Sequence, residues 1–464
     1  MPAYSSFAYV TVLIKAAILH CLRLSPTASL LDLKTAVFLA LVRSSTSNLK
    51  PGRLIDCQQD SLRDVDLKER IYLVSTKLTL TFETNIIAIA FRAIRNLGNG
   101  EETISDISLP SVSLEWICHR TSSDGTALDT DDAGRVYATM MREVKNKTTI
   151  LYFHGGQFWR MGRAPRQITH ELSRDSGGRC LAVRYRLSPQ NPFPTALIEG
   201  LAAYLYLLYP PAGSLHAPVA ASDICFAGDS AGGNLAIALV QLILEITREG
   251  SKNAPGRLIW NGQERDLPIP AGVSILSPYN DLTRALDSES NLQYDIIPAR
   301  GPPFTSFDPC GIWPTKPPRH HVYANDNALL HPLVSPVTAR DWTGAPPTWI
   351  CVGEECLADQ GMFVAQRMAS QDVPVVLEQY SAMPHNFSLL IPELEASKCS
   401  KKRWASFIRS STNNPESITT EAMRWSGNTL FRTSLNISKL VPLSIESLKE
   451  EMETQIKEWG SPPL

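Results

Sequence analysis

The stretch Gly228-Asp229-Ser230-Ala231-Gly232-Gly233 follows a short apolar run, Ile224 to Ala227, and precedes an apolar stretch of helical length. A serine between two glycines at a strand-to-helix junction is typical of a nucleophile held in a strained turn. The glycines two positions before and after it remove side chains that would collide there. The spacing alone is weak, because it arises by chance in roughly one chain of this length in ten. A glycine-rich turn with a bystander serine is therefore the alternative. The predicted strand and helix favour Ser230 as nucleophile, with Gly228, Asp229 and Gly232 supporting the turn.

A second glycine turn, His154-Gly155-Gly156, ends an earlier apolar run from Thr149 to Phe153. Acyl transfer passes through a tetrahedral oxyanion, which backbone N–H groups must meet in fixed positions. A glycine turn upstream of the nucleophile is where such donors belong. We predict that the N–H groups of Gly155, Gly156 and Ala231 form an oxyanion hole, with His154 supporting the turn. A plain tight turn is the alternative.

A nucleophilic serine needs a general base, and the base needs an acid that orients it. Where the serine lies in such a strand-to-helix turn, the chain order is serine, acid, histidine. His385 fits this order, because it lies in a turn after a late predicted strand, Val375 to Leu377. A lone histidine is usually structural, but this position favours a catalytic role. Three other histidines precede the acid and are poor candidates: His320, His321 and His331.

Three carboxylates follow the predicted strand Thr348 to Val352 and compete for the role of the acid. Glu355 lies in the first turn of the loop, where the carboxyl edge of a parallel sheet faces the site, and we favour it. Asp359 is the alternative acid, although we expect it to begin the next helix as a capping or surface carboxylate. Glu354 is the third possibility.

The pattern of apolar runs along the chain predicts an α/β fold. Near-continuous apolar strands that alternate with helices indicate a mostly parallel sheet covered on both faces. We expect a largely helical N-terminal cap or extension over residues 1–145 and a catalytic domain over residues 146–396. Within that domain, residues 283–346 are rich in Pro, Asp and Trp and are expected to be an insertion over the active site rather than core. Residues 397–464 are expected to form a polar, helical C-terminal extension.

Composition narrows the range of partners. The 464 residues are 44% hydrophobic and 19% charged, with a formal net charge of -2, so a large core is expected and nucleic acid is not. The nine scattered cysteines are an odd number, which favours a reducing compartment. We expect a cytoplasmic protein, with endomembrane association as the alternative.

The apolar segment Phe7 to Leu22 is interrupted by Lys15 and His20. It falls short of the roughly 18 uninterrupted apolar residues of a spanning helix. We predict a packed cap helix. Peripheral membrane contact is the first alternative and a true anchor the second.

Together these motifs resemble the hormone-sensitive-lipase-like esterases of the α/β-hydrolase superfamily, over residues Thr148 to Leu390. The likeness extends to Tyr185-Arg186-Leu187-Ser188-Pro189 and Phe193-Pro194. The sequence as a whole is most similar in character to the members of this group found in filamentous fungi. It implies a cap over the pocket and hydrolysis of short to medium acyl esters, without a metal or organic cofactor. Two positions depart from the pattern: Gln157 stands where a third glycine is common, and Glu355 where an aspartate is usual.

These observations predict a serine hydrolase that cleaves small, hydrophobic carboxylic esters through a Ser-His-acid triad. The same triad also serves amidases, formamidases and acyltransferases, which the sequence does not separate. A non-catalytic ligand receptor is the alternative from another class, because a fold does not fix a function.

Overall fold

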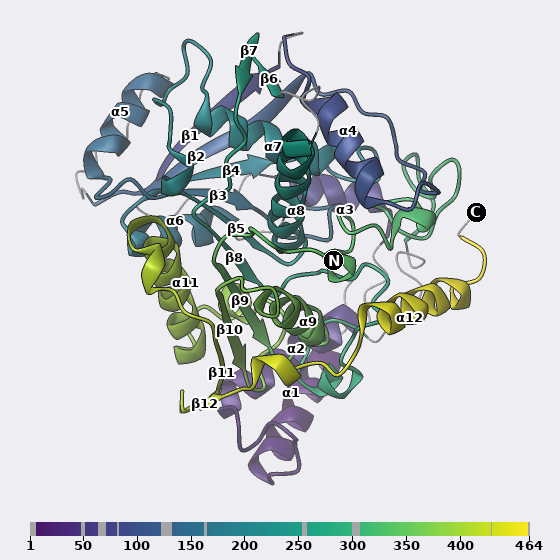
Figure 1. Cartoon of the computed structure of the whole chain (residues 1–464). Helices are drawn as coiled ribbons and strands as arrows, with labels where there is room; N and C mark the ends of the chain where they lie inside the picture. The colour runs from purple at the N-terminus through teal and green to yellow at the C-terminus, as the bar shows by residue number, and fades with distance from the viewer. Residues whose placement is uncertain are drawn as a thin grey trace.

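A ten-stranded sheet runs through the computed structural model of the chain, which describes residues 6–47, 52–63, 71–80, 83–121, 132–161, 165–252, 258–298, 307–427 and 429–462 (Figure 1). The strand order is β1-β2-β4-β3-β5-β8-β9-β10-β11-β12. The seven strands from β4 to β11 are parallel, whereas β1, β2 and β12 join antiparallel. The strands are β1 Ile71–Thr79, β2 Ser111–His119, β3 Thr149–Phe153, β4 Arg179–Arg184, β5 Ile224–Asp229, β8 Gly272–Leu276, β9 Thr348–Gly353, β10 Val375–Tyr380, β11 Glu421–Trp425 and β12 Arg432–Ser434.

Helices cover both faces of the sheet (Figure 1). Strand β3 shows why its sequence reads as a continuous apolar run: all five residues are buried. Leu151 and Phe153 enter one apolar core, while Ile150 and Tyr152 enter the core on the other face. On one face pack α7 Thr195–Leu208, α8 Ala231–Lys252 and α9 Ala358–Ala369; on the other pack α6 Pro165–Ser176 and α11 Glu395–Asn413.

The four apolar runs named above are confirmed as strands β3, β5, β9 and β10. Two further apolar runs in the sequence, Cys180 to Val183 and Val273 to Leu276, also predict buried strands and are confirmed as β4 and β8. The sequence further predicts helices at 197–208, 234–247 and 444–459, which correspond to α7, α8 and α12, the last at Ile445–Glu458. Among the described residues one helical stretch, Ala231–Gly250, has the length and composition to cross a membrane. Because 83% of it is buried within the fold, it is the central core helix.

The expectation of a largely helical segment up to residue 145 is wrong in part. Strands β1 and β2 pair over nine residues each and extend the central sheet. Helix α4 Ile86–Leu97 lies between them in the sequence, and α5 Ala133–Glu143 follows β2. Alternate side chains of β1 are buried, a period-2 pattern weaker than the continuous runs of the parallel strands. The C-terminal extension likewise contributes a sheet strand, since β11 pairs in parallel with β10.

The segment 283–346 was expected to lie over the sheet rather than in the core. It has only short 3₁₀ turns as regular structure among its described residues, but many of its apolar side chains are buried. Tyr323, Leu333 and Trp342 belong to the same core as α7 and α8. The segment is therefore part of the core that packs on the sheet, although irregular in backbone.

The first two helices, α1 Ser6–Cys21 and α2 Leu33–Ser47, form a hairpin at the end of the molecule near β12 (Figure 1). Helix α2 begins after Asp32, whose carboxylate accepts hydrogen bonds from the Thr35 N–H at 3.0 Å and the Thr35 hydroxyl at 2.8 Å. Leu31 and Leu39 are buried in the apolar core that also contains Met383 and Phe387. The segment from Leu31 into α2 thus contributes to the same apolar core as the loop that follows β10.

Candidate active site

The turn that carries Ser230 joins β5 to α8. Ser230 has a φ of +53°, a left-handed conformation that non-glycine residues rarely adopt. Its N–H donates to Leu276 O at 2.9 Å, and its carbonyl accepts from Tyr279 N–H at 3.1 Å. A Cβ at Gly232 would lie 2.0 Å from Phe153 O, so only glycine lets this turn approach β3 so closely. The elbow is therefore fixed by sheet contacts on both sides.

Ser230, His385 and Glu355 form one hydrogen-bonded line across three loops at the carboxyl edge of the sheet. His385 Nε2 lies 3.0 Å from Ser230 Oγ. His385 Nδ1 makes a short hydrogen bond to Glu355 Oε2. The Glu355 side chain is fully buried, and Ser230 and His385 are nearly so. The structure thus brings together three residues that lie as far as 155 positions apart in the sequence.

The second oxygen of Glu355 is also saturated. Oε1 accepts hydrogen bonds from the Ser277 hydroxyl at 2.6 Å and from Gly353 N–H at 3.0 Å. Ser277 Oγ in turn accepts from Asn386 N–H at 3.0 Å. Ser277 was not predicted from the sequence. It directly follows β8, which pairs with β9, the strand that leads to Glu355. A hydroxyl at the carboxyl end of this neighbouring strand is the feature from which it could have been predicted.

The competing acids have other partners. Glu354 Oε2 accepts from Ala382 N–H at 2.7 Å. Asp359 lies in the first turn of α9, as expected, and burial raises the pKa of its carboxyl. The other candidate histidines are also held elsewhere: His320 bonds Asp326, His321 accepts from Tyr323 N–H, and His331 donates to Ile94 O.

A buried aspartate that was not predicted from the sequence ties together the loops that carry Glu355 and His385. Asp295 Oδ1 accepts from His385 N–H at 2.9 Å, and Asp295 Oδ2 accepts from Cys356 N–H at 2.7 Å. Arg43 of α2 donates to the Asp295 carbonyl at 2.7 Å. Asp295 thus fixes the backbone beside both His385 and Glu355, and it links them to the N-terminal hairpin.

Asp229, the residue before Ser230, joins the turns on the other side of the site. Asp229 Oδ1 accepts from the Tyr152 hydroxyl at 2.6 Å and from Gly155 N–H at 2.9 Å, and Oδ2 accepts from the Asn386 amide at 3.1 Å. Burial raises the pKa of the Asp229 carboxyl, and these hydrogen bonds oppose the rise. Asp229 therefore joins the elbow, the glycine turn and the histidine loop.

This contact corrects one part of the predicted oxyanion hole. The N–H of Gly155 already donates to Asp229, so it is not free to meet an oxyanion. Within the described part of the chain, no hydrogen-bond acceptor is recorded for the N–H groups of Gly156, Gln157 and Ala231. Gly156 has a φ of +115°, and a Cβ there would lie 2.1 Å from Arg160 O. The glycine requirement of the turn is thus strongest at position 156.

His154 and Gln157, which flank the two glycines, shape the turn through side-chain contacts. The His154 ring stacks on Tyr185, with centroids 4.1 Å apart, and the Tyr185 hydroxyl donates to His154 O at 2.7 Å. Burial lowers the pKa of His154 to about 4, so its ring is neutral at pH 7. The Gln157 side chain accepts from the Trp159 indole at 3.0 Å.

Charge around His385 favours its protonated form. Burial alone lowers its pKa, but the carboxylates of Glu355, Asp295 and Asp229 raise it, and the net result is a raised pKa. This is the electrostatic setting of a base that becomes an imidazolium during the reaction.

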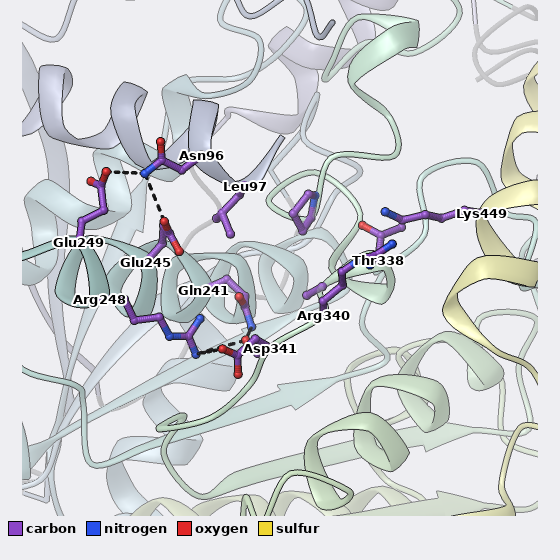
Figure 2. Close-up of a pocket in the computed structure, with 12 residues that line it drawn as sticks. Asn96, Leu97, Gln241, Glu245, Arg248, Glu249, Thr338, Arg340, Asp341 and Lys449 are labelled. Carbon is purple, nitrogen blue, oxygen red and sulfur yellow. Dashed lines mark hydrogen bonds and ion pairs between the residues drawn. The ribbon is translucent and has the colours of Figure 1, made fainter. Parts of the chain in front are cut away.

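Outside this site, a polar hollow lies between α4, α8 and the segment 338–341 (Figure 2). Its side chains pair with one another: Asn96 donates to Glu245, and Arg248 forms an ion pair with Asp341 at 3.2 Å. None of the predicted catalytic residues lines it. Among the described residues, no group of three or more His, Cys, Asp or Glu side chains is placed to hold a metal.

The chain is similar to known esterases over most of its length. It is 28% identical over 270 residues to an acetyl-hydrolase of Streptomyces hygroscopicus, covering 57% of this chain and 76% of the relative. It is 27% identical over 339 residues to the carboxylesterase NlhH of Mycobacterium tuberculosis, covering 71% and 91%. A solved esterase of the bacterial hormone-sensitive lipase family superposes with a TM-score of 0.51 at 21% identity, covering 81% of this chain and 97% of that one.

A family model described as the alpha/beta hydrolase fold matches residues 150–389, more than half of the chain. The match begins within β3 and ends within α10 Phe387–Leu390, so it contains both glycine turns, Glu355 and His385. The chain belongs to the α/β-hydrolase family.

Proposed function

We propose that the protein hydrolyses small, hydrophobic carboxylic esters through an acyl-enzyme on Ser230. The observation that carries this proposal is the continuous line from Ser230 Oγ through His385 to Glu355. The names of the esterase relatives support the choice of an ester as substrate.

In the proposed first step, His385 Nε2 accepts the Ser230 proton while Oγ attacks the ester carbonyl carbon. The hydrogen bond to Glu355 holds the Nδ1 proton in place, so that Nε2 is the free acceptor. The imidazolium then donates its proton to the leaving alcohol. In the second step, water attacks the acyl-enzyme with His385 as base, and the Ser230 hydroxyl is restored.

We propose that the N–H groups of Gly156, Gln157 and Ala231 stabilise the oxyanion. Ala231 is the first residue of α8, and a helix N-terminus favours negative charge. Gly155 instead positions the turn through Asp229. A single donor of this kind typically contributes about 2.7–4 kcal/mol to lowering the barrier.

The first test is hydrolysis of p-nitrophenyl acetate, butyrate and octanoate, beside the matching p-nitroanilides. Ester hydrolysis well above anilide hydrolysis is the expected result, and the chain-length preference then measures the acyl pocket. Faster hydrolysis of the anilides would replace the esterase proposal with an amidase. A folded protein that cleaves none of them would contradict both.

Gly156→Ala is expected to lower kcat about 10²- to 10³-fold, the loss typical of one oxyanion donor. The new methyl group would collide with Arg160 O and displace the donor turn. The matched control is Gly213→Ala, which also has positive φ but open space around it. Steady-state kinetics with p-nitrophenyl butyrate measure both variants. Equal activity of the two variants would show that the turn has no catalytic part.

Asp295→Asn is expected to lower kcat about tenfold with little change in KM, because an amide NH₂ would face either His385 N–H or Cys356 N–H. Removing the carboxylate also lowers the pKa of His385. The acidic limb of the pH–rate profile should therefore move to lower pH. A variant that loses only thermal stability, with kcat and the pH profile unchanged, would give Asp295 a structural role alone.

A further inference from the structure

Helix α1 exposes an apolar stripe. Val10, Ile14 and Ile18 repeat every four residues on one side of the helix and are 47%, 54% and 51% exposed. Leu22 and Leu24, just beyond the helix, are 63% and 67% exposed. Of the nine large apolar side chains exposed in the described part of the chain, seven lie between Val10 and Phe38. Exposed apolar side chains thus gather on one hairpin, which is how interaction surfaces are recognised.

The charged side chains of α1 and of the turn up to residue 31 are all basic. No Asp or Glu precedes Asp32 in the sequence, although the whole chain has a net charge of -2. The basic residues Lys15, Arg23 and Lys34 are exposed among or beside the apolar side chains. Apolar side chains interleaved with basic ones are the pattern of a helix that lies on an anionic bilayer surface.

We propose that α1 docks the protein on an anionic lipid surface, with Val10, Ile14, Ile18 and Leu22 entering the interface. A spanning role does not fit, since 16 helical residues extend about 24 Å and a bilayer core is about 30 Å thick. A second copy of the chain fits less well, because a two-fold contact would place the same basic patch on both sides.

Docking here would orient the active site toward the lipid. Helix α2 shares an apolar core with the histidine loop, and its Arg43 donates to Asp295, which accepts from His385 N–H. An apolar ester dissolved in the bilayer would therefore lie on the side of the molecule where the N-terminal hairpin meets the catalytic loops. The docking proposal itself does not depend on the esterase mechanism, because it can be measured without a substrate.

The test is co-sedimentation of the full chain with vesicles of phosphatidylserine and phosphatidylcholine, and with vesicles of phosphatidylcholine alone. Binding to the anionic vesicles is expected, and Ile14→Asp/Ile18→Asp should reduce the bound fraction at least tenfold. Lys15→Ser should weaken binding severalfold and reduce its dependence on salt. The matched control for the double variant is Leu62→Asp, at an exposed leucine directly after helix α3 (Leu54–Ser61). The matched control for Lys15→Ser is Lys457→Ser on α12.

Thermal unfolding checks that Ile14→Asp/Ile18→Asp folds like the wild-type chain, as expected for exposed positions. Wild-type protein that stays in solution with anionic vesicles would overturn the proposal. Undiminished binding of the double variant would also overturn it, because another surface would then hold the lipid. A wild-type dimer that the double variant splits, measured by light scattering without vesicles, would assign the stripe to a second copy instead.

Discussion

Ser230→Ala is expected to lower kcat for p-nitrophenyl butyrate about 10⁶-fold, the size of loss seen when a serine hydrolase loses its nucleophile. The Oγ atom that lies 3.0 Å from His385 Nε2 is the only atom removed. The backbone of the elbow is held by Leu276 O and Tyr279 N–H, which do not involve the side chain. The variant should therefore fold and melt close to the wild-type temperature.

The matched control for this change is Ser370→Ala, an exposed serine at the end of α9. It should retain full activity. Activity in Ser230→Ala within tenfold of the wild type, with the protein folded, would move the nucleophile to another residue. A loss that the control shares would point to handling of the protein rather than to chemistry.

Glu355→Gln is expected to lower kcat about 10⁴-fold while the fold is kept, because the base would take the wrong tautomer. Ser277 and Gly353 both donate to Oε1, so the oxygen of a glutamine would stay with them. Its NH₂ group would then face His385 Nδ1 and donate to it. The imidazole proton would move to Nε2, where Ser230 needs an acceptor. Steady-state kinetics at saturating substrate measure the loss.

The same variant makes a pH prediction. In the wild type the raised pKa of His385 places the acidic limb of the pH–rate profile above 6.5, the ordinary value for histidine. Glu355→Gln removes the largest charge that raises this pKa, so burial should bring the limb below that of the wild type. The His385–Glu355 pair also affects the stability of the fold. Because folding raises the pKa of His385, this stabilisation is complete below the unfolded-state pKa and is lost as the pH rises through the folded-state pKa.

Asp359→Asn is the comparison that separates the two candidate acids. It should retain most of the activity, because Asp359 begins α9 and does not bond His385. A larger loss in Asp359→Asn than in Glu355→Gln would reverse the assignment.

That Ser230, Glu355 and His385 meet could be predicted from the sequence because it follows from the parallel sheet. Strands β5, β9 and β10 end at one edge, so the residues after each strand meet there whatever their separation. Continuous apolar runs gave those strands with near-correct bounds. The choice of Glu355 depended on loop position and agrees with the geometry, whereas Ser277, which holds its second oxygen, was not predicted although its hydroxyl directly follows β8.

Features that depend on side-chain contacts were not predictable. Gly155 and Gly156 are adjacent and look alike in the sequence, but only the fold shows that Asp229 occupies the N–H of the first. Strand β1 was missed because only alternate side chains are buried, which weakens the apolar signal. Strand β2 is mostly buried, but Ser113 and Glu115 interrupt its apolar run. Asp295 lies in an irregular segment without periodicity, so no sequence pattern predicted its contacts with two distant loops.

The most direct test of the central claim is titration with a p-nitrophenyl alkylphosphonate followed by peptide mass spectrometry. Ser230 Oγ should bond to phosphorus and expel p-nitrophenolate, with His385 accepting the serine proton. We predict one equivalent of p-nitrophenolate per chain, the adduct on the peptide that contains Ser230, and no adduct in Ser230→Ala. An adduct on another residue, or an active enzyme that the phosphonate does not label, would contradict the account.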